Sequence, residues 1–238
     1  MNMTIDLHTH SIASGHAFNT IDEMAKYASD KGVTHLGITE HAPMMPGTCH
    51  EFYFQNLHIV PREKFGVKLF LGTEVNILND LGEVDLPNGL LKRLDIVIAS
   101  MHTPCMKPNT EEYNTNAVIN AMKNPYINII GHPDDSRYPL DYEKIVMASK
   151  EYNTLLEINN ASLNPNGPRK NAAQNDELIL QLCKEHKVPV ILGSDAHIGN
   201  RICNFENLMP LIEKIEFPME LIVNTSFDKL EKHLTNLI

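Results

Sequence analysis

Hydrophobic positions along the chain fall into short apolar runs that are separated by longer amphipathic stretches. The runs are rich in Val, Ile and Leu at consecutive positions, which is typical of strands buried on both faces of a parallel sheet. They predict seven strands and, more weakly, an eighth, over residues 4–7, 34–39, 68–74, 95–100, 127–131, 154–158, 189–194 and 221–224.

The stretches between these runs carry helix signals. Thr20 and Glu23 have the spacing of a capping box, and apolar residues follow at helical spacing as far as Gly32. Further helices are predicted over 111–123, 141–152, 172–186, 205–215 and 226–237, whereas the period over 50–64 is obscured by aromatic residues and Pro61. Strands that alternate with helices predict a (β/α) barrel or a doubly wound sheet. No linker interrupts the pattern, so we expect a single domain over residues 1–238.

Composition and charge narrow the class of protein. The chain is 42% hydrophobic and 21% charged, which predicts a folded core rather than disorder. Its net charge of −10 disfavours a nucleic acid or an anionic membrane as partner. No secretory signal or membrane-spanning run is visible, and the four cysteines form no C-x-x-C pair. We therefore expect a cytoplasmic protein with free thiols, and the sequence does not indicate its oligomeric state.

Residues that bind metals follow most of the predicted strands. The chain has 12 histidines, as many as it has glycines. Five of them lie away from the strand ends and are interpreted as structural or surface residues: His35, His50, His58, His186 and His233. The candidate ligands lie at or just beyond strand ends: His8, His10, His16, His41, Glu74, His102, His132, Asp195 and His197. In a parallel barrel these ends share the face on which barrel enzymes place their chemistry.

The spacing of these residues suits more than one ion. The pairs His8-x-His10 and Asp195-x-His197 each direct two side chains to the same side of an extended segment, and Glu74 has two oxygens that can bridge two ions. Zinc takes about four ligands, so the set predicts two or three ions. Imidazole-rich sites favour zinc, iron, nickel or copper, with manganese where carboxylates contribute, and we expect zinc first.

Seven motifs give the chain a resemblance to a known family. They are D-L-H-T-H-S-x-A-S-x-H (6–16), I-T-E-H (38–41), G-T-E-V-N-I (72–77), S-M-H (100–102), G-H-P (131–133), E-I-N-N (157–160) and G-S-D-A-H (193–197). The chain thereby resembles the PHP domain, named for polymerase and histidinol phosphatase, and within it the small YcdX-type phosphatases. The resemblance implies a distorted seven-stranded (β/α) TIM-like barrel with three metal ions on its C-terminal face.

The resemblance also implies which residues hold each ion. One ion would be bound by His8, His10, Glu74 and Asp195, a second by Glu74, His102 and His132, and a third by His16, His41 and His197. Zinc is the first expectation, with manganese or iron as alternatives. Glu40 replaces an Asp that is frequent in the family, at a position that is not a ligand, so we expect it to affect only groups around the ligands.

The activity expected from these residues is hydrolysis of a phosphate monoester through attack of a metal-activated hydroxide. The expected catalytic residues are Asp195, Glu74 and His102, and Asp195 would accept a hydrogen bond from the hydroxide. The candidate phosphate clamps are Arg169, Lys170 and Arg201, for which a solvated surface position is an equally good interpretation. The partner would be a small phosphorylated substrate.

Three other functions use similar residues. Metal-dependent amidohydrolases open C–N bonds in a barrel, but they often bridge their metals with a lysine, where this chain offers Glu74, and the additional His16 and His41 favour three ions. Histidinol phosphatases are usually somewhat longer. A 3'-5' exonuclease-like phosphodiesterase, or a non-catalytic PHP domain of a DNA polymerase, is disfavoured by the net charge of −10.

Overall fold

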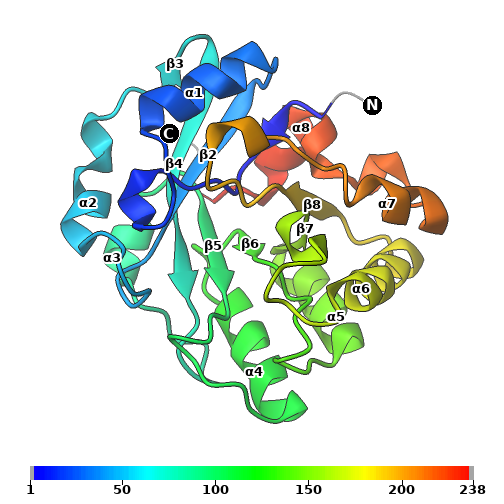
Figure 1. Ribbon diagram of the computed structural model, residues 1–238. Helices are drawn as coiled ribbons and strands as arrows, with labels where there is room; N and C mark the ends of the chain where they lie inside the picture. Colours follow the sequence, from blue (N-terminus) through cyan, green and yellow to red (C-terminus); the bar gives the residue numbers. More distant parts are fainter. Residues whose placement is uncertain (1–2, 236–238) are drawn as a thin grey trace.

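A sheet nearly closed into a barrel organises the computed structural model, which describes residues 3–235 (Figure 1). Seven strands follow one another in the sheet in chain order, and every neighbouring pair on this path is parallel. They are β1 (Ile5–Asp6), β2 (His35–His41), β4 (Val67–Asn76), β5 (Val97–Ser100), β6 (Ile129–Ile130), β7 (Leu155–Asn159) and β8 (Val190–Gly193). The short β3 (Glu63–Lys64), which the sequence did not predict, pairs antiparallel with β4. The expected barrel of seven parallel strands is confirmed.

Helices surround this sheet (Figure 1). They are α1 (Ile21–Asp30), α2 (Glu51–Asn56), α3 (Asn88–Leu91), α4 (Glu111–Met122), α5 (Tyr142–Tyr152), α6 (Ala172–His186), α7 (Met209–Ile215) and α8 (Phe227–Leu230). The capping box of α1 is confirmed, because Glu23 N donates to Thr20 Oγ1 and Thr20 N donates to the Glu23 carboxylate at 2.7 Å. Instead of one helix over 226–237, α8 is followed by a 3₁₀ turn, η7 (Glu231–His233), and residues 236–238 lie outside the described part. None of the helices within residues 3–235 has the length and hydropathy to cross a membrane.

Side chains join the two ends of the sheet, β1 and β8. Asn224 Nδ2 donates to Ile5 O at 3.0 Å and to Leu192 O at 2.8 Å, and Leu192 N donates to Asn224 Oδ1 at 2.7 Å. The carboxylate of Asp6 accepts from Ser194 N at 3.3 Å and from Cys203 N at 2.7 Å. Beyond these contacts Thr9 and Ala196 form a parallel bridge. Two polar side chains thus connect β1 with β8, and in the described chain backbone pairing at the seam occurs only beyond these strands, at Thr9 and Ala196.

The prediction of a weak eighth strand over 221–224 is wrong. This segment forms two 3₁₀ turns, η5 (Met219–Leu221) and η6 (Val223–Thr225), with one bridge between Val190 and Ile222. Burial of Ile222 and Val223 explains the strand-like apolar pattern. The side chain of Asn224, rather than the backbone of a further strand, satisfies the peptide groups of the adjoining strands.

Along β4 and β7, the side chains that point into the barrel change from apolar to acidic. Because alternate residues share a face, β4 directs Phe70, Gly72 and Glu74 inward, and β7 directs Leu155 and Glu157 inward. The first residue of each series belongs to an apolar cluster that fills the N-terminal half of the barrel and includes Ile5, Leu7, Ile96, Ile98, Ile129 and Ile191. The acidic residues come later on the strands, so they lie above this apolar floor at the C-terminal end.

We predict that Asn224→Leu destabilises the fold. The substitution leaves Leu192 N and two carbonyl oxygens of the seam without their partner, and each buried unsatisfied group costs about 1–3 kcal/mol. The free energy of unfolding measured in urea should therefore fall by about 2–4 kcal/mol. Asn116→Leu on the exposed face of α4 is the matched control. A value for Asn224→Leu equal to that of the control would contradict the role given to this side chain.

Candidate metal centre

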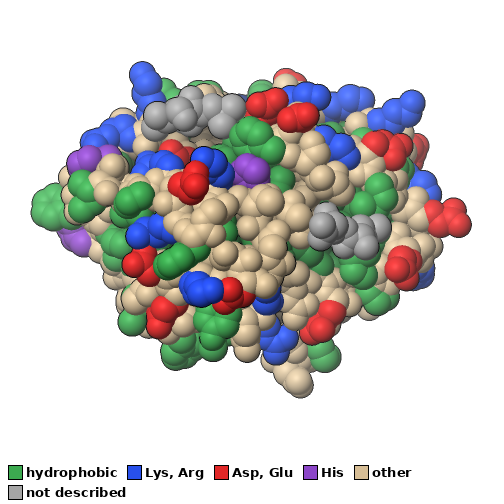
Figure 2. Space-filling model, turned by 90° about the horizontal axis from the view of Figure 1, so that it is seen from above, with side chains coloured by type: hydrophobic (Ala, Val, Ile, Leu, Met, Phe, Trp, Pro, Cys, Tyr) green, Lys and Arg blue, Asp and Glu red, His purple; other side chains and the backbone are tan. Residues whose placement is uncertain are grey.

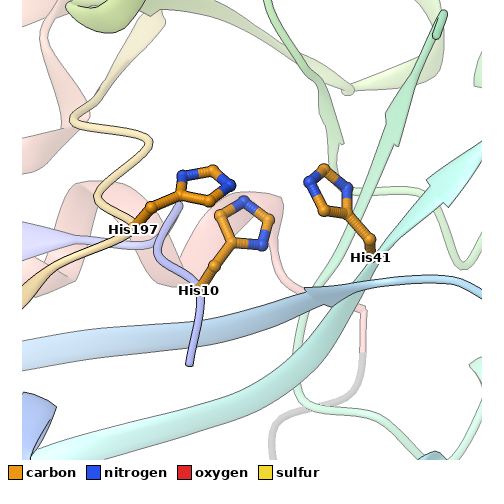
Figure 3. A group of neighbouring side chains, drawn as sticks. All are labelled: His10, His41 and His197. Carbon is orange, nitrogen blue, oxygen red and sulfur yellow. The ribbon is translucent and has the colours of Figure 1, made fainter. Parts of the chain in front are cut away.

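The structure brings all nine predicted ligands together at the C-terminal ends of the strands. They come from separate segments: His8 and His10 follow β1, His41 ends β2, Glu74 lies near the end of β4, and His102, His132, Asp195 and His197 follow β5, β6 and β8. His16 follows the 3₁₀ turn η1 (Ile12–Ser14). Figure 3 shows how His10, His41 and His197 approach one another from three different parts of the chain.

Glu74 lies at the centre of this group and is fully buried. Its Oε1 is 3.2 Å from His102 Nε2 and 2.9 Å from His132 Nε2. Its Oε2 faces three other imidazoles: His41 Nδ1 at 2.8 Å, His8 Nε2 at 3.4 Å and His10 Nε2 at 3.5 Å. The two oxygens therefore have different sets of neighbours, which is the geometry of a carboxylate shared between two ions.

Asp195 and His197 make a second set of contacts within the cluster. Asp195 Oδ1 lies 3.4 Å from His10 Nε2, 3.8 Å from His8 Nε2 and 3.5 Å from His197 Nδ1. His197 Nε2 is 3.0 Å from His16 Nε2, and the His16 ring stacks against His41 with centroids 5.0 Å apart. His16 is thus part of the same cluster even though it is the most exposed of its members.

Two of these residues have an unusual backbone conformation. Asp195 has φ 53° and His132 has φ 30°, in the left-handed region that non-glycine residues rarely adopt. Such a conformation costs on the order of 1–3 kcal/mol and persists where the surrounding structure enforces it. Here it occurs directly after β8 and after β6, where the chain must turn while the side chain still points to the centre.

The donor atoms of the cluster fit divalent metal ions. Four buried atoms lack the geometry of a hydrogen bond to any described residue, although Glu74 Oε2 lies 2.8–3.5 Å from the other three, which are His8 Nε2, His10 Nε2 and His41 Nδ1. Buried polar atoms without a partner are rare in folded proteins because they are costly. Four overlapping groups of three residues place their ligand atoms within 4.8 Å of one another: His8, His10 and Glu74; His8, His132 and Asp195; His41, Glu74 and His102; His10, His41 and His197.

For Glu74 and His102, the charges of the cluster oppose the effect of burial on the pKa. Burial alone would raise the pKa of Glu74, but His102, His41 and His8 lower it well below its usual range. Burial lowers the pKa of His102 to about 4 although Glu74 opposes this, and burial lowers the pKa of His10 well below its usual range. At neutral pH Glu74 is therefore charged and these two imidazoles are neutral, which are the forms that bind metal.

Three polar residues hold the ligands in place, and the sequence reasoning did not identify them. Glu157 Oε1 accepts from His8 Nδ1 at 2.7 Å, and its Oε2 accepts from His132 N at 2.9 Å. Asn76 Oδ1 accepts from His102 Nδ1 at 2.7 Å. Ser14 Oγ accepts from His10 Nδ1 at 3.1 Å. Each bond to Nδ1 fixes the ring and leaves Nε2 directed at the centre, as is usual for histidines that bind metal.

Glu40 belongs to the surroundings of the ligands rather than to the ligands. Its carboxylate accepts from Ser11 N at 3.1 Å and from Ser14 Oγ at 2.5 Å, and Tyr53 OH donates to it at 3.3 Å. Burial raises the pKa of Glu40, although the hydrogen bonds from Ser11 and Ser14 oppose this. Glu40 thus holds the Ser14 hydroxyl that contacts the His10 ring.

The three candidate phosphate clamps have different positions. Arg169 lies against the centre: its Nη2 donates to Asp195 Oδ2 at 3.2 Å, and its Nη1 donates to Ser162 Oγ at 3.0 Å. Arg201 is exposed, lies 3.5 Å from Glu206, and lines a pocket that also includes Asp195. The side chain of Lys170 is exposed and contacts none of the candidate ligands within the described chain. The structure thus brings Arg169 to the centre and Arg201 to its edge, but does not bring Lys170 there.

Comparison with known proteins adds to this geometry. The model of the PHP domain matches residues 6–166. A probable phosphatase of Clostridium novyi is 47% identical over 98% of this chain and 95% of its own, and a probable phosphatase of Thermoanaerobacter pseudethanolicus is 45% identical with the same coverage. Among solved structures, the histidinol phosphate phosphatase of Lactococcus lactis, complexed with zinc, L-histidinol and phosphate, matches with TM-score 0.64 and 20% identity over 91% of this chain and 95% of that chain. This last likeness concerns the fold.

Proposed function

The chain belongs to the PHP domain family and is a metal-dependent phosphoric ester hydrolase, and we propose that it hydrolyses phosphate monoesters at a centre of three divalent ions. The position of Glu74 carries the proposal. One of its oxygens faces two imidazoles and the other faces three, in a cluster where four buried ligand atoms make no hydrogen bond within residues 3–235. Nine ligand residues exceed what one or two open sites need. The substrate that we propose is a small phosphorylated molecule.

We propose the division of the ligands among the ions that the resemblance to the PHP domain implies. His8, His10, Glu74 and Asp195 would hold the first ion, Glu74, His102 and His132 the second, and His16, His41 and His197 the third. Zinc is the first choice because imidazoles predominate, and manganese and iron are the alternatives. Zinc is also the metal in the Lactococcus lactis structure.

Bound divalent ions would lower the pKa of a water molecule. They would also place positive charge beside the phosphoryl oxygens. The residues of the chain orient these components. Arg169 holds Asp195 Oδ2 and thereby directs Oδ1 toward His10 and His8. The same guanidinium is a candidate for binding the phosphoryl group, because its planar donors suit phosphate oxygens. Arg201 would contact the part of the substrate that occupies the adjoining pocket.

We also propose that residues 1–238 form one hydrolase barrel in the cytoplasm. The sheet runs without interruption from β1 to β8, and Asp6 and Asn224 connect its two ends. All four cysteines are described and are free thiols, which supports a reducing compartment.

The experiment that tests the proposal combines metal analysis with activity. Chelator-stripped protein should not hydrolyse nitrophenyl phosphate, and added zinc, manganese or iron should restore activity together with about three bound ions per chain, as the ligand count implies. His102→Ala should abolish turnover, because it removes a ligand beside Glu74. His186→Ala at the end of α6 is the matched control. Near-normal turnover of His102→Ala, or full activity without metal, would refute the proposal.

The alternative functions receive less support. The residue whose two oxygens face the surrounding imidazoles is Glu74, whereas many amidohydrolases bridge their metals with a lysine. The net charge of −10 does not favour a nucleic acid substrate, and on the face shown in Figure 2 acidic and basic side chains are interspersed without a continuous basic area. Histidinol phosphatase activity is suggested by the solved neighbour alone, so L-histidinol phosphate belongs in any substrate panel.

A further inference from the structure

A pocket opens directly beside the metal centre. Its volume is about 390 Å³, and Asp195 and His197 form part of its wall. The remaining wall comes from two segments, residues 160–165 after β7 and residues 194–207 after β8. If the phosphoryl group of a substrate lies at the ligands, the leaving group has this space next to it. The pocket is at the small end of the roughly 300–1,000 Å³ that is usual for ligand sites, which suits a leaving group about as large as one sugar ring.

Four of the residues that line this pocket have carboxamide side chains. They are Asn160, Asn164, Asn204 and Asn207. Asn160 is buried and fixed, because its Oδ1 accepts from Asn207 N at 3.0 Å while its backbone oxygen accepts from Asn207 Nδ2 at 3.4 Å. Within residues 3–235, Asn160 Nδ2, Asn164 Nδ2 and Asn207 Oδ1 make no hydrogen bond, so donors and acceptors remain for a ligand. Hydroxyl groups match this set because each of them both donates and accepts.

The rest of the wall disfavours charged and aromatic leaving groups. Apart from His197, no described residue of the wall has an aromatic ring on which a base or an aryl group could stack. The charged side chains are already matched: Arg201 lies 3.5 Å from Glu206, and Asp195 is 3.2 Å from Arg169. An ammonium group or a second phosphate would therefore have to compete with these pairs for an oppositely charged partner.

We propose that this pocket binds a neutral, hydroxyl-rich leaving group, and that the substrate is a monosaccharide or polyol monophosphate. The inference rests on the proposed phosphatase function, which places the phosphoryl group at the ligands. Within that function, the carboxamides of Asn160, Asn164 and Asn207 determine specificity by their hydrogen bonds to the leaving group.

The first test compares substrates with the metal-loaded, full-length enzyme. The panel consists of glucose monophosphate, glycerol phosphate, L-histidinol phosphate, adenosine monophosphate and nitrophenyl phosphate. One of the two polyhydroxylated esters should have a kcat/KM about tenfold or more above those of the histidinol and adenosine esters, since the missing hydrogen bonds are worth about that factor. A preference for the histidinol or adenosine ester would overturn this inference alone. No metal-dependent hydrolysis of any ester would overturn the proposed function as well.

The second test determines whether the asparagine side chains of the pocket wall cause the substrate preference. Asn207→Leu replaces an exposed amide by an apolar group of similar size, so the fold should tolerate it. The ratio of kcat/KM for the preferred polyhydroxylated ester to that for nitrophenyl phosphate should fall about tenfold, because hydrogen bonds made only by the former are lost. Asn166→Leu, on the same loop as Asn164 but outside the wall, should leave this ratio unchanged. An unchanged ratio in Asn207→Leu would overturn the inference.

Discussion

Replacing Glu74 by Gln is expected to lower kcat/KM for nitrophenyl phosphate by on the order of 10³-fold, because losing the ligand that we propose to hold two ions would cost several kcal/mol of transition-state stabilisation. Gln has the shape of Glu but only one ligand oxygen and no charge. It can face either His102 and His132 or the three imidazoles at Oε2, but not both sets. We therefore expect fewer bound ions as well as lower activity, measured by elemental analysis and steady-state kinetics on the same preparation.

Two further variants serve as controls for Glu74→Gln. Glu112→Gln makes the same chemical change on an exposed face of α4 and should leave ion content and kinetics unchanged. Glu74→Asp keeps the charge but shortens the side chain, so it should retain more ions than Glu74→Gln. If Glu74→Gln bound the native number of ions and turned over substrate at a near-native rate, Glu74 would not be a bridging ligand.

The parallel strands were predictable because burial on both faces requires continuous apolar residues. That pattern identifies where each strand ends, and in a parallel barrel all the C-terminal ends share one face. For this reason the positions of Glu74 and His132 in the chain were enough to predict that they lie together, and the structure places Glu74 Oε1 2.9 Å from His132 Nε2. The resemblance to the PHP domain then added the assignment of the candidate ligands, His16 included, to three ions.

The closure of the barrel was not predictable from local patterns. Asp6 and Asn224 look like ordinary interruptions of apolar runs, and their partners Cys203 and Ile5 lie about two hundred positions away in the chain, as the distances of 197 and 219 residues show. The apolar pair Ile222 and Val223 predicted a strand in a segment where the side chain of Asn224, rather than the backbone, bonds to the adjoining strands. Such contacts depend on the assembled barrel rather than on the sequence around them.

The role of Arg169 also depends on tertiary structure. In the sequence it is a basic residue on a loop rich in asparagine, equally compatible with a phosphate clamp and a surface charge. In the structure the loop folds back over the centre, and the guanidinium pairs with Asp195 Oδ2. Burial alone would lower the pKa of Arg169, but Asp195 and Asp134 raise it, so the side chain is held as a cation beside the ligands.

Glu157 is the missed residue for which the sequence did contain a signal. It is a single acidic residue inside the apolar run Leu155, Leu156 and Ile158. A buried carboxylate needs a partner. The sequence alone could not say which one, because His8 is 149 positions away. The Glu157 carboxylate packs tightly against Gly193. A Cβ added at Gly193 would lie 1.8 Å from Glu157 Oε1, so only glycine leaves room for this carboxylate.

Glu157→Gln is expected to weaken metal binding by about 10–100-fold, the usual effect of removing a partner that orients a ligand. The amide can satisfy only one of its two neighbours. If its oxygen accepts from His8 Nδ1, its NH₂ group faces the N–H of His132; if it is turned round, His8 Nδ1 must become an acceptor. His8 then carries its proton on Nε2, the atom that faces Glu74 and would bind the ion. Either orientation impairs one ligand.

The measurement for Glu157→Gln separates positioning from catalysis. Stripped protein is titrated with zinc while activity on nitrophenyl phosphate is followed at each free zinc concentration. Because Glu157 acts through His8 and His132, half-maximal activity should require about 10–100-fold more free zinc, and saturating zinc should restore most of kcat. Glu143→Gln, exposed on α5, should behave like the native protein. A loss of kcat that zinc does not restore would show that Glu157 has a more direct role in the reaction, whereas an unchanged zinc requirement would show that His8 and His132 keep their orientation without it.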